Sequence, residues 1–198
     1  LPAGSIYYNE NSLNIPDGMS VTFFGLPGEK QAIIGVKSID IAGTHDFIKF
    51  ENVEITGASM KADGNNTIND YLFNQSKAST VGSIEFSNSL INGFKNTPVR
   101  LQGSDIKVID LVKFENCTVF GADARTYSLI HIDASSGKGK IENIEFSKTT
   151  VIYSGKCLVY SRNTDFTSLK LADCTFSKLL GSGDYILDCD KNGNGPSQ

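Results

Sequence analysis

An eight-residue pattern of apolar and polar positions recurs along the chain. Its first full copy is residues 48–55, where apolar and polar residues alternate up to an Asn and then resume with the alternation shifted by one place. Successive side chains of a β-strand point to opposite faces, so this alternation predicts short strands with one buried face. Further copies begin at Ile84, Val112, Ile144 and Leu169, and a weaker one lies at residues 21–23.

The distance between copies is irregular, ranging from 25 residues (146 to 171) to 36 residues (50 to 86). A solenoid tolerates this irregularity, because its loops vary in length while its strands stay in register. The sequence therefore predicts an all-β protein, a right-handed parallel β-helix of about six coils with three short strands each. The third residue of each copy should lie in one interior column, which contains Phe50, Phe86, Phe114, Phe146 and Leu171.

Two further columns follow from this register. The residue between the two inward positions alternates in charge, and parallel strands about 4.8 Å apart would let each charge meet an opposite one. This column contains Lys49, Glu85, Lys113, Glu145 and Lys170. The polar residue after the first strand should form a sharp corner, where Asn tolerates a left-handed backbone. The corner residues are Asn52, Asn88, Asn116, Lys148 and Asp173.

Just past the corner, a column of small residues should point inward. It includes Cys117 and Cys174, which the register separates by two coils, about 9.6 Å at the usual strand spacing. This separation exceeds the reach of a disulfide, so no bridge between them is expected. The four cysteines lie in apolar contexts without a Cys-x-x-Cys spacing, and we interpret them as buried thiols.

Another strand per coil is expected at residues 39–41, 71–74, 99–101, 129–132, 158–160 and 185–189. Residues 1–190 are then one β-helix domain, in which 1–45 form the lead-in and first coil, and 191–198 are a tail or linker. The last coil would expose strand edges, so more chain, a cap or a partner should cover it.

Composition excludes some partners. The net charge is −4 and the pI about 5.2, with both signs interspersed, so no basic patch points to nucleic acid. No apolar run approaches the roughly 18 residues of a membrane-spanning helix. The chain begins at Leu1 without Met or a signal sequence, which we interpret as a processed or trimmed chain whose export cannot be judged from this end.

The strand before each long return loop gives an outward row over about 24 Å. It mixes carboxylates, a guanidinium, an imidazole and a phenol, groups that commonly hold an extended sugar chain, although an ordinary solvated sheet face would have a similar composition. The row is Asp40, Asn74, Arg100, His131, Tyr160 and Asp188, of which we predict Arg100, His131, Tyr160 and Asp188 as ligand-binding residues. The register places apolar residues on the same face, so either the register slips or a patch there is covered. These residues are Leu72, Pro98, Leu129, Leu158 and Ile186.

No catalytic residue, metal site or cofactor is assigned. His131 has no Ser or Cys nucleophile that the sequence pairs with it, and His45 is placed in a loop. Residues 188–193 follow the first half of a calcium loop, with Asp188, Asp190 and Asn192 as oxygen donors. The closing Glu of such a loop would fall at position 199, beyond the chain, so calcium binding there is left open.

The motifs "IKFENVEITG", "IEFSNSLINGF" and "VKFENCTVFG", together with the Gly-rich segment 1–35, resemble the pectate-lyase-like superfamily of right-handed β-helices. Within it the chain is similar, over about residues 1–190, to uncharacterised domains of secreted or surface-anchored proteins of gut bacteria. The resemblance implies a secreted or cell-surface location and an extracellular polysaccharide as ligand or substrate. Lyases of this superfamily use clustered Asp residues for calcium and an Arg or Lys base, a cluster that does not emerge here. Of the glycosidase pattern only Asn163-Thr164-Asp165 is matched, and the Gly-His-Gly and Arg-Ile-Lys segments are absent.

These observations favour an extracellular β-helix domain that binds or presents complex carbohydrate along the face of Arg100, His131 and Tyr160, without an assigned catalytic activity. One alternative is a polysaccharide lyase or glycoside hydrolase whose catalytic parts lie in a neighbouring domain. Another is a structural or adhesin stalk. In each case a further domain of the same protein is an expected partner.

Overall fold

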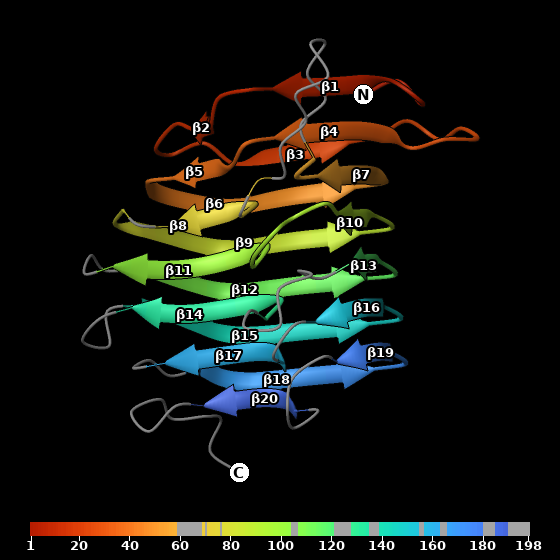
Figure 1. Ribbon diagram of the computed structural model, residues 1–198. Coiled ribbons are helices and arrows are strands. Elements are labelled where there is room, and N and C mark those ends of the chain that lie inside the picture. The colour runs from red at the N-terminus through yellow and green to blue at the C-terminus, as the bar shows by residue number, and fades with distance from the viewer. Residues whose placement is uncertain are drawn as a thin grey trace.

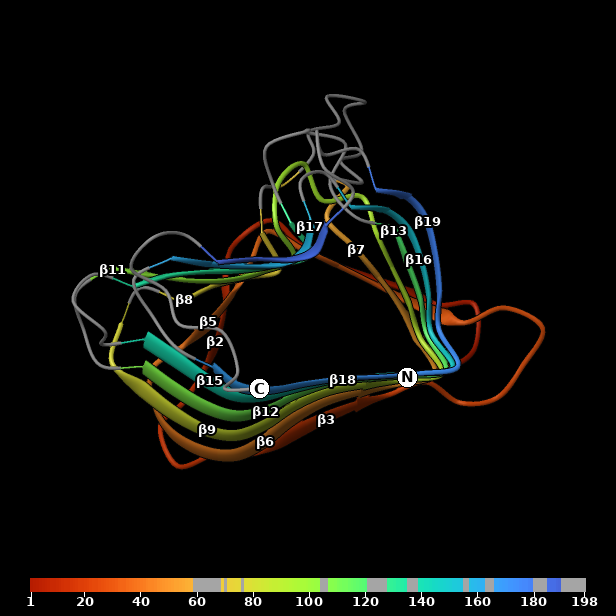
Figure 2. The same ribbon diagram turned by 90° about the horizontal axis from the view of Figure 1, so that it is seen from below.

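The computed structural model describes residues 1–58, 69, 71–75, 77–103, 107–120, 128–134, 139–154, 157–162, 166–179 and 185–189. Every regular element in these residues is a β-strand, and the strands pair in parallel into three sheets. Consecutive strands pass from one sheet to the next as the chain winds along a single axis (Figure 1). Viewed along that axis, the three sheets surround the interior and the winding is right-handed (Figure 2). The predicted fold class is confirmed.

Each coil contributes one strand to each sheet, and we name the sheets A, B and C in the order in which the chain enters them. Sheet A contains β1 (Ile6–Asn9), β4 (Ala32–Val36), β7 (Val53–Thr56), β10 (Leu90–Asn92), β13 (Thr118–Phe120), β16 (Thr150–Ser154) and β19 (Thr175–Leu179). Sheet B contains β2 (Leu13–Ile15), β5 (Ile39–Ile41), β8 (Phe73–Gln75), β11 (Val99–Gly103), β14 (Ile130–Ala134), β17 (Cys157–Arg162) and β20 (Tyr185–Cys189). Sheet C contains β3 (Val21–Phe24), β6 (Gly43–Glu51), β9 (Ser79–Ser87), β12 (Lys107–Glu115), β15 (Gly139–Ser147) and β18 (Phe166–Ala172).

The number of coils is close to the predicted six, but not every strand is short. Four strands of sheet C have nine residues, because the chain before each apolar motif also pairs with the neighbouring coils. Residues 43–45 pair with 79–81, and residues 47–51 with 83–87. The sequence pattern identified only the second half of these strands.

The interior of sheet C is built on a column of stacked aromatic rings. Neighbouring rings lie 4.7–5.2 Å apart between centroids and within 11° of parallel. Leu171 continues the column below Phe146 through the same strand register. The rings exclude water almost completely, since Phe50 to Phe146 are at most 1% exposed. The column contains Phe23, Phe50, Phe86, Phe114 and Phe146, so the predicted interior column is confirmed.

The corner between sheets C and A has the predicted left-handed backbone. In the described part of the chain, the non-Gly residues with positive φ are Asn52, Asn88, Asn116, Lys148 and Asp173, with φ between 49° and 54°. The Asn116 amide donates a hydrogen bond of 2.7 Å to the Asn88 side-chain oxygen. The Asn52 amide donates to the Gly25 carbonyl at 2.9 Å, so side chains at this corner bridge consecutive coils.

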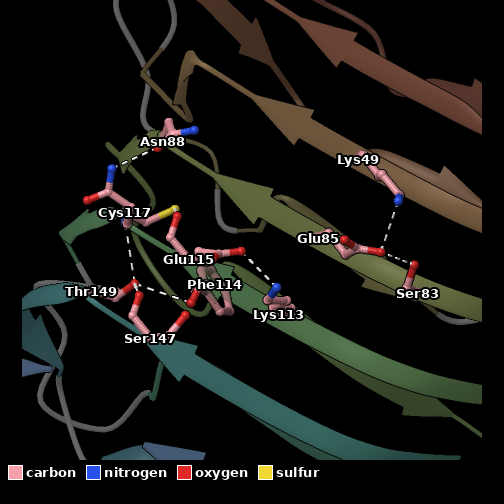
Figure 3. Close-up of polar contacts among 11 residues, drawn as sticks. Lys49, Ser83, Glu85, Asn88, Lys113, Phe114, Glu115, Cys117, Ser147 and Thr149 are labelled. Atoms are coloured by element: carbon pink, nitrogen blue, oxygen red, sulfur yellow. Dashed lines mark hydrogen bonds and ion pairs between the residues drawn. The ribbon is translucent and has the colours of Figure 1, made fainter. Parts of the chain in front are cut away.

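Past the corner, the column of small residues points inward as predicted. The Thr149 hydroxyl donates to the Ser147 carbonyl at 2.9 Å and accepts a hydrogen bond of 3.3 Å from the Cys117 amide (Figure 3). Cys117 and Cys174 are free thiols, in agreement with the absence of a bridge between them. The buried polar groups of this corner are therefore satisfied locally.

The charged column on the outside of sheet C is interrupted in the middle. Lys49 lies 3.3 Å from Glu85, and Lys170 lies 2.8 Å from Glu145, as the alternation predicts. Lys113 instead pairs at 2.7 Å with Glu115, two residues along its own strand (Figure 3). The predicted order of the column is right, whereas its continuous pairing is wrong, because a second acid on the same face competes for the central lysine.

His45 was expected in a loop, and this prediction is wrong. It lies in β6 with 2% of its surface exposed and points into the interior. Its ring nitrogens lie 2.6 Å from the Met19 carbonyl and 3.1 Å from the Ala42 carbonyl. His45 is thus a hydrogen-bonded core residue of the first coils.

The expected tail at 191–198 lies outside the described residues, and the last described strand, β20, ends at Cys189. In the part of the chain that the structure describes, no helix has the length and apolar character needed to cross a membrane.

The corner conformation should be measurable as stability. Asn116→Ala keeps a β-carbon at φ 51°, loses the short polar side chain that lets Asn tolerate this conformation, and removes the hydrogen bond to Asn88. Asn116→Gly removes the same bond but tolerates the conformation, so the Ala variant should be less stable than the Gly variant by about 1 kcal/mol. Urea unfolding of both variants checks this, and equal stabilities would contradict a conformational role for the corner.

The central ring of the aromatic column should dominate core stability. Phe86 is 1% exposed and stacks on both Phe50 and Phe114. Phe86→Ala should destabilise the fold by about 3–5 kcal/mol through lost burial and the cavity left behind. Phe86→Leu, which repeats the residue found at position 171, should cost clearly less in the same denaturation experiment. A loss below 1 kcal/mol for Phe86→Ala, a value at the low end for buried truncations, would be incompatible with this packing.

Candidate functional site

The predicted outward row lies on sheet B in one register. Arg100 is paired with Asn74 on one side and with His131 on the other. His131 is in turn paired with Tyr160, and Tyr160 with Asp188. Asp40 precedes this series, since its neighbour Ile39 pairs with Phe73. We call Asp40, Asn74, Arg100, His131, Tyr160 and Asp188 the sheet B row.

Alternate residues in these strands point into the core, which fixes the row on the outer face. Val99 and Leu101 flank Arg100 and are fully buried, as are Ile130 and Ile132 on either side of His131. Arg100, His131 and Tyr160 are themselves half-buried. The β-alternation therefore holds these side chains on a rigid surface at about 4.8 Å from coil to coil.

Arg100 is positioned by an aromatic residue just before β8. Its Nη1 donates a hydrogen bond of 2.6 Å to the Tyr71 hydroxyl, and its guanidinium carbon lies 5.1 Å from the centre of the Tyr71 ring. The Nε of Arg100 is shielded from solvent, and no acceptor among the described residues lies within hydrogen-bond distance of it. Arg100 is thus a fixed cation with unused donor capacity.

His131 and Tyr160 form an aromatic pair further along the row. Their ring centroids are 4.8 Å apart and the ring planes are inclined by 68°. This edge-to-face arrangement stabilises both rings relative to each other. The row therefore combines hydrogen-bonding groups with a rigid aromatic surface.

Four of the five apolar residues expected beside the row are covered, whereas Ile186 on the last coil is 38% exposed, and the register does not slip. Leu72, Leu129 and Leu158 are fully buried and belong to the core cluster, and Pro98 is also buried. The backbone groups of Leu72 and Pro98 are hydrogen-bonded between coils, with Leu72 N donating to Pro98 O at 3.0 Å. The interior thus extends beyond the start of the sheet B strands, a feature that strand alternation alone does not predict.

Part of the predicted site lies outside the described residues and side chains. The side chains of Asn74 and Asp188 are not among those described, although their backbones are. Residues 190–193 of the calcium-like segment, and Asn163-Thr164-Asp165, lie outside the described residues. Within the ranges that are described, no group of three or more His, Cys, Asp or Glu side chains is arranged to hold a metal ion.

A second polar surface lies along the corner between sheets C and A. A groove of about 530 Å³ is lined by Glu51, Ser87, Asn88, Glu115, Asn116 and Lys148. The hydrogen bond from Lys113, and then its charge, hold the pKa of Glu115 below its ordinary value. The same bond raises the pKa of Lys113. These polar groups pair largely with one another and with the neighbouring coil, which favours a structural role for the corner.

The connections between strands differ in length at the two surfaces. From the second coil onward, the corner between sheets C and A is always one or two residues long. The connections leading into sheet B vary, from residues 37–38 before β5 to 57–72 before β8 and 121–129 before β14. In solenoids, insertions of variable length gather around the face that carries function. Sheet B is therefore the better candidate site.

Comparisons of the chain with known protein families, with characterised proteins and with solved structures found no match.

Tyr71 is the residue that the sequence interpretation missed. The sequence predicts a strand over residues 71–74, but Tyr71 lies just before β8, and its hydroxyl and ring hold Arg100, one coil away. Its signal in the sequence is weak, because the residues equivalent to it in the following coils are Thr97 and Ser128, which are not aromatic.

The reactivity of the three described cysteines tests how tightly the interior is packed. Cys117 and Cys157 are 3% and 0% exposed, whereas Cys174 is half-exposed on the last coil. Burial raises the pKa of the Cys117 thiol to about 11. Because the thiolate is the reactive form, only about one Cys117 in a thousand is ionised at pH 8. Iodoacetamide labelling at pH 8, read by peptide mass spectrometry, should modify Cys174 before Cys117 and Cys157, which should react only in urea. Equal labelling rates for the three in the native protein would contradict the packing.

Proposed function

We propose that this chain is an extracellular β-helix domain that binds or presents complex carbohydrate along the sheet B row. The observation that carries the proposal is the in-register file of Arg100, His131 and Tyr160 on one outer face. The proposed location outside the cell rests on the resemblance of the coil motifs to secreted β-helix domains. The burial of Cys117 and Cys157 would shield both thiols from oxidants there.

The geometry of the row suits an extended, hydroxyl-rich polymer. Its groups are repeated at the strand spacing, so one ligand chain lying along the axis could contact several coils in succession. Arg100 offers a half-buried guanidinium held in place by Tyr71, while the rings of His131 and Tyr160 offer the apolar surface on which sugars commonly lie. Fixed side chains lose little conformational entropy on binding, which favours affinity for a polymer with weak individual contacts.

Binding without chemistry is the form of the proposal that we favour. The sequence pairs no Ser or Cys nucleophile with His131, whose ring packs edge to face on Tyr160. Lyase or glycosidase activity remains the alternative. It would appear as an increase in ultraviolet absorbance from unsaturated sugars or as new reducing ends when the chain is incubated with polysaccharides.

A glycan array with the whole chain, followed by calorimetry on the best ligand, tests the proposal. Arg100→Gln and Tyr160→Ala should each weaken binding about tenfold, since each removes a contact worth about 1.4 kcal/mol. Lys49→Ala is the matched control, because it removes a positive charge from the outer face of sheet C and should leave the affinity unchanged. Thermal melting of each variant verifies folding.

The outcomes separate the candidates. If the parent chain binds no glycan, or if Arg100→Gln and Tyr160→Ala bind as the parent does, the sheet B proposal fails. The remaining alternative is a structural stalk. It would be indicated if the chain binds no ligand and substitutions on all of its outer faces leave its folding unchanged.

A further inference from the structure

A second groove lies on the outside of the molecule, where the corner between sheets C and A meets the strands of sheet A. It has a volume of about 440 Å³, and none of the described residues that line it is ionisable. It shares Asn88 and Asn116 with the polar groove described above but extends over β10 and β13. The corner lies across the cross-section from sheet B, so this groove is separate from the sheet B row (Figure 2). We call it the sheet A groove, and its lining includes Gln31, Asn88, Leu90, Asn116, Thr118 and Phe120.

The floor of the sheet A groove is partly apolar. Leu90 and Thr118 are paired neighbours in the strand register, and Phe120 follows two residues after Thr118. Ile91 and Val119, which alternate with these residues, are at most 1% exposed. The alternation therefore turns the three floor side chains outward, where each is half-buried. They offer an aliphatic surface, a hydroxyl and an aromatic ring.

The wall of the groove consists of three side-chain amides that hydrogen bonds hold in place. The Asn116 amide donates to the Asn88 side-chain oxygen at 2.7 Å. Gln31, in the loop between β3 and β4, donates to the Asn88 carbonyl at 2.6 Å. These bonds use one end of each side-chain amide and fix its position, so little conformational entropy is lost when a ligand binds.

The other end of each amide is available to a ligand. Among the described residues, no partner lies within hydrogen-bond distance of Asn88 Nδ2, Asn116 Oδ1 or Gln31 Oε1. The Thr118 hydroxyl likewise has no partner in the described part of the chain. The groove therefore presents one amide donor, two amide acceptors and a hydroxyl that can do both, all of them uncharged.

We infer that the sheet A groove binds a single neutral sugar ring, such as a terminal hexose of a glycan. Sugar hydroxyls both donate and accept hydrogen bonds, so they match the mixed donors and acceptors of the groove. The C–H face of a sugar ring packs on an aromatic surface, which Phe120 provides. The volume falls in the range of about 300–1,000 Å³ that small-molecule sites occupy. This inference does not rest on the sheet B row.

The neighbouring coils limit the ligand to one ring. On the coil before, the Asn52 side chain is engaged at both ends, because its amide donates to Gly25 and its oxygen accepts from Gln31. On the coil after, Lys148 occupies the corner position and brings a charge. The available amides of the corner thus span two coils about 4.8 Å apart, whereas an extended polymer or peptide would need the same groups on further coils.

Chemical-shift mapping by two-dimensional NMR of the isotope-labelled chain tests the inference. The probes are the methyl glycosides of glucose, galactose, mannose and N-acetylglucosamine, with methyl glucuronide as the charged comparison. At least one neutral glycoside should bind with a Kd on the order of 1 mM and shift the amide signals of residues 88–90 and 116–120. The glucuronide should bind no more tightly than the methyl glucoside, since no cation is among the described residues that line the groove.

Two variants remove the proposed contacts. Phe120→Ala should weaken binding about tenfold through loss of the aromatic surface, and Thr118→Val about fivefold through loss of the hydroxyl. Phe47→Ala and Thr80→Val are the matched controls, because they make the same changes on the outer face of sheet C, and both should bind as the parent does. All four side chains are half-buried or exposed, so the variants should fold, and thermal melting verifies this.

Four results would overturn the inference. In the first, no neutral glycoside shifts any signal up to about 10 mM, well above the expected Kd. In the second, the shifts fall on the strands of Arg100 and His131 and leave residues 88–90 and 116–120 unchanged, which would support the sheet B proposal instead. In the third, Phe120→Ala and Thr118→Val bind as their controls do. In the fourth, the glucuronide binds at least about tenfold more tightly than the glucoside, which would show that the groove selects a charged ligand.

Discussion

The in-register pairing of each coil with the next is the constraint on which the rest of the structure depends. A slip of one residue would turn every inward side chain of a strand outward, so the pairing decides the core and the outer faces together. Two devices hold it. The aromatic rings from Phe23 to Phe146 stack within 11° of parallel, and the corner residues repeat one left-handed conformation on each coil from the second onward. Both devices act between neighbouring coils, so each coil fixes the strand register of the next one along the axis.

Most of the architecture could be predicted because its determinants are local. The alternation around Phe50 identifies the buried face, and Asn88 marks the corner through its own backbone preference. Features that depend on competition between neighbours were not predictable. Lys113 has three acids near it on the outer face, Glu85 and Glu145 on the neighbouring coils and Glu115 on its own strand, and the pattern does not indicate that Lys113 pairs with Glu115. His45 has a polar side chain, and only the carbonyls that meet it in the fold make its burial acceptable.

In the candidate site, too, some features follow from the local sequence and others depend on contacts with neighbouring coils. The row through Arg100, His131 and Tyr160 followed from aligning one strand per coil, and the strand register agrees with that alignment. The role of Tyr71 did not follow, because it reaches Arg100 from the neighbouring coil and from outside the strand. The burial of Leu72 and Leu129 was equally hidden, since the residues that precede the strands of sheet B pack into the core cluster. Sequence periodicity thus locates the surface, while the contacts that orient its side chains arise from the connections.

The short corner between sheets C and A makes each coil an interchangeable module. Residues 89–116 run from just past one left-handed Asn to the next equivalent one, and they begin and end at the same place in the cross-section. Tandem duplication of such a segment would lengthen the molecule by one coil and leave the pairing of the other coils unchanged. Evolution or design could therefore adjust the length of an outer face in steps of a single strand spacing, independently of the chemistry displayed on it.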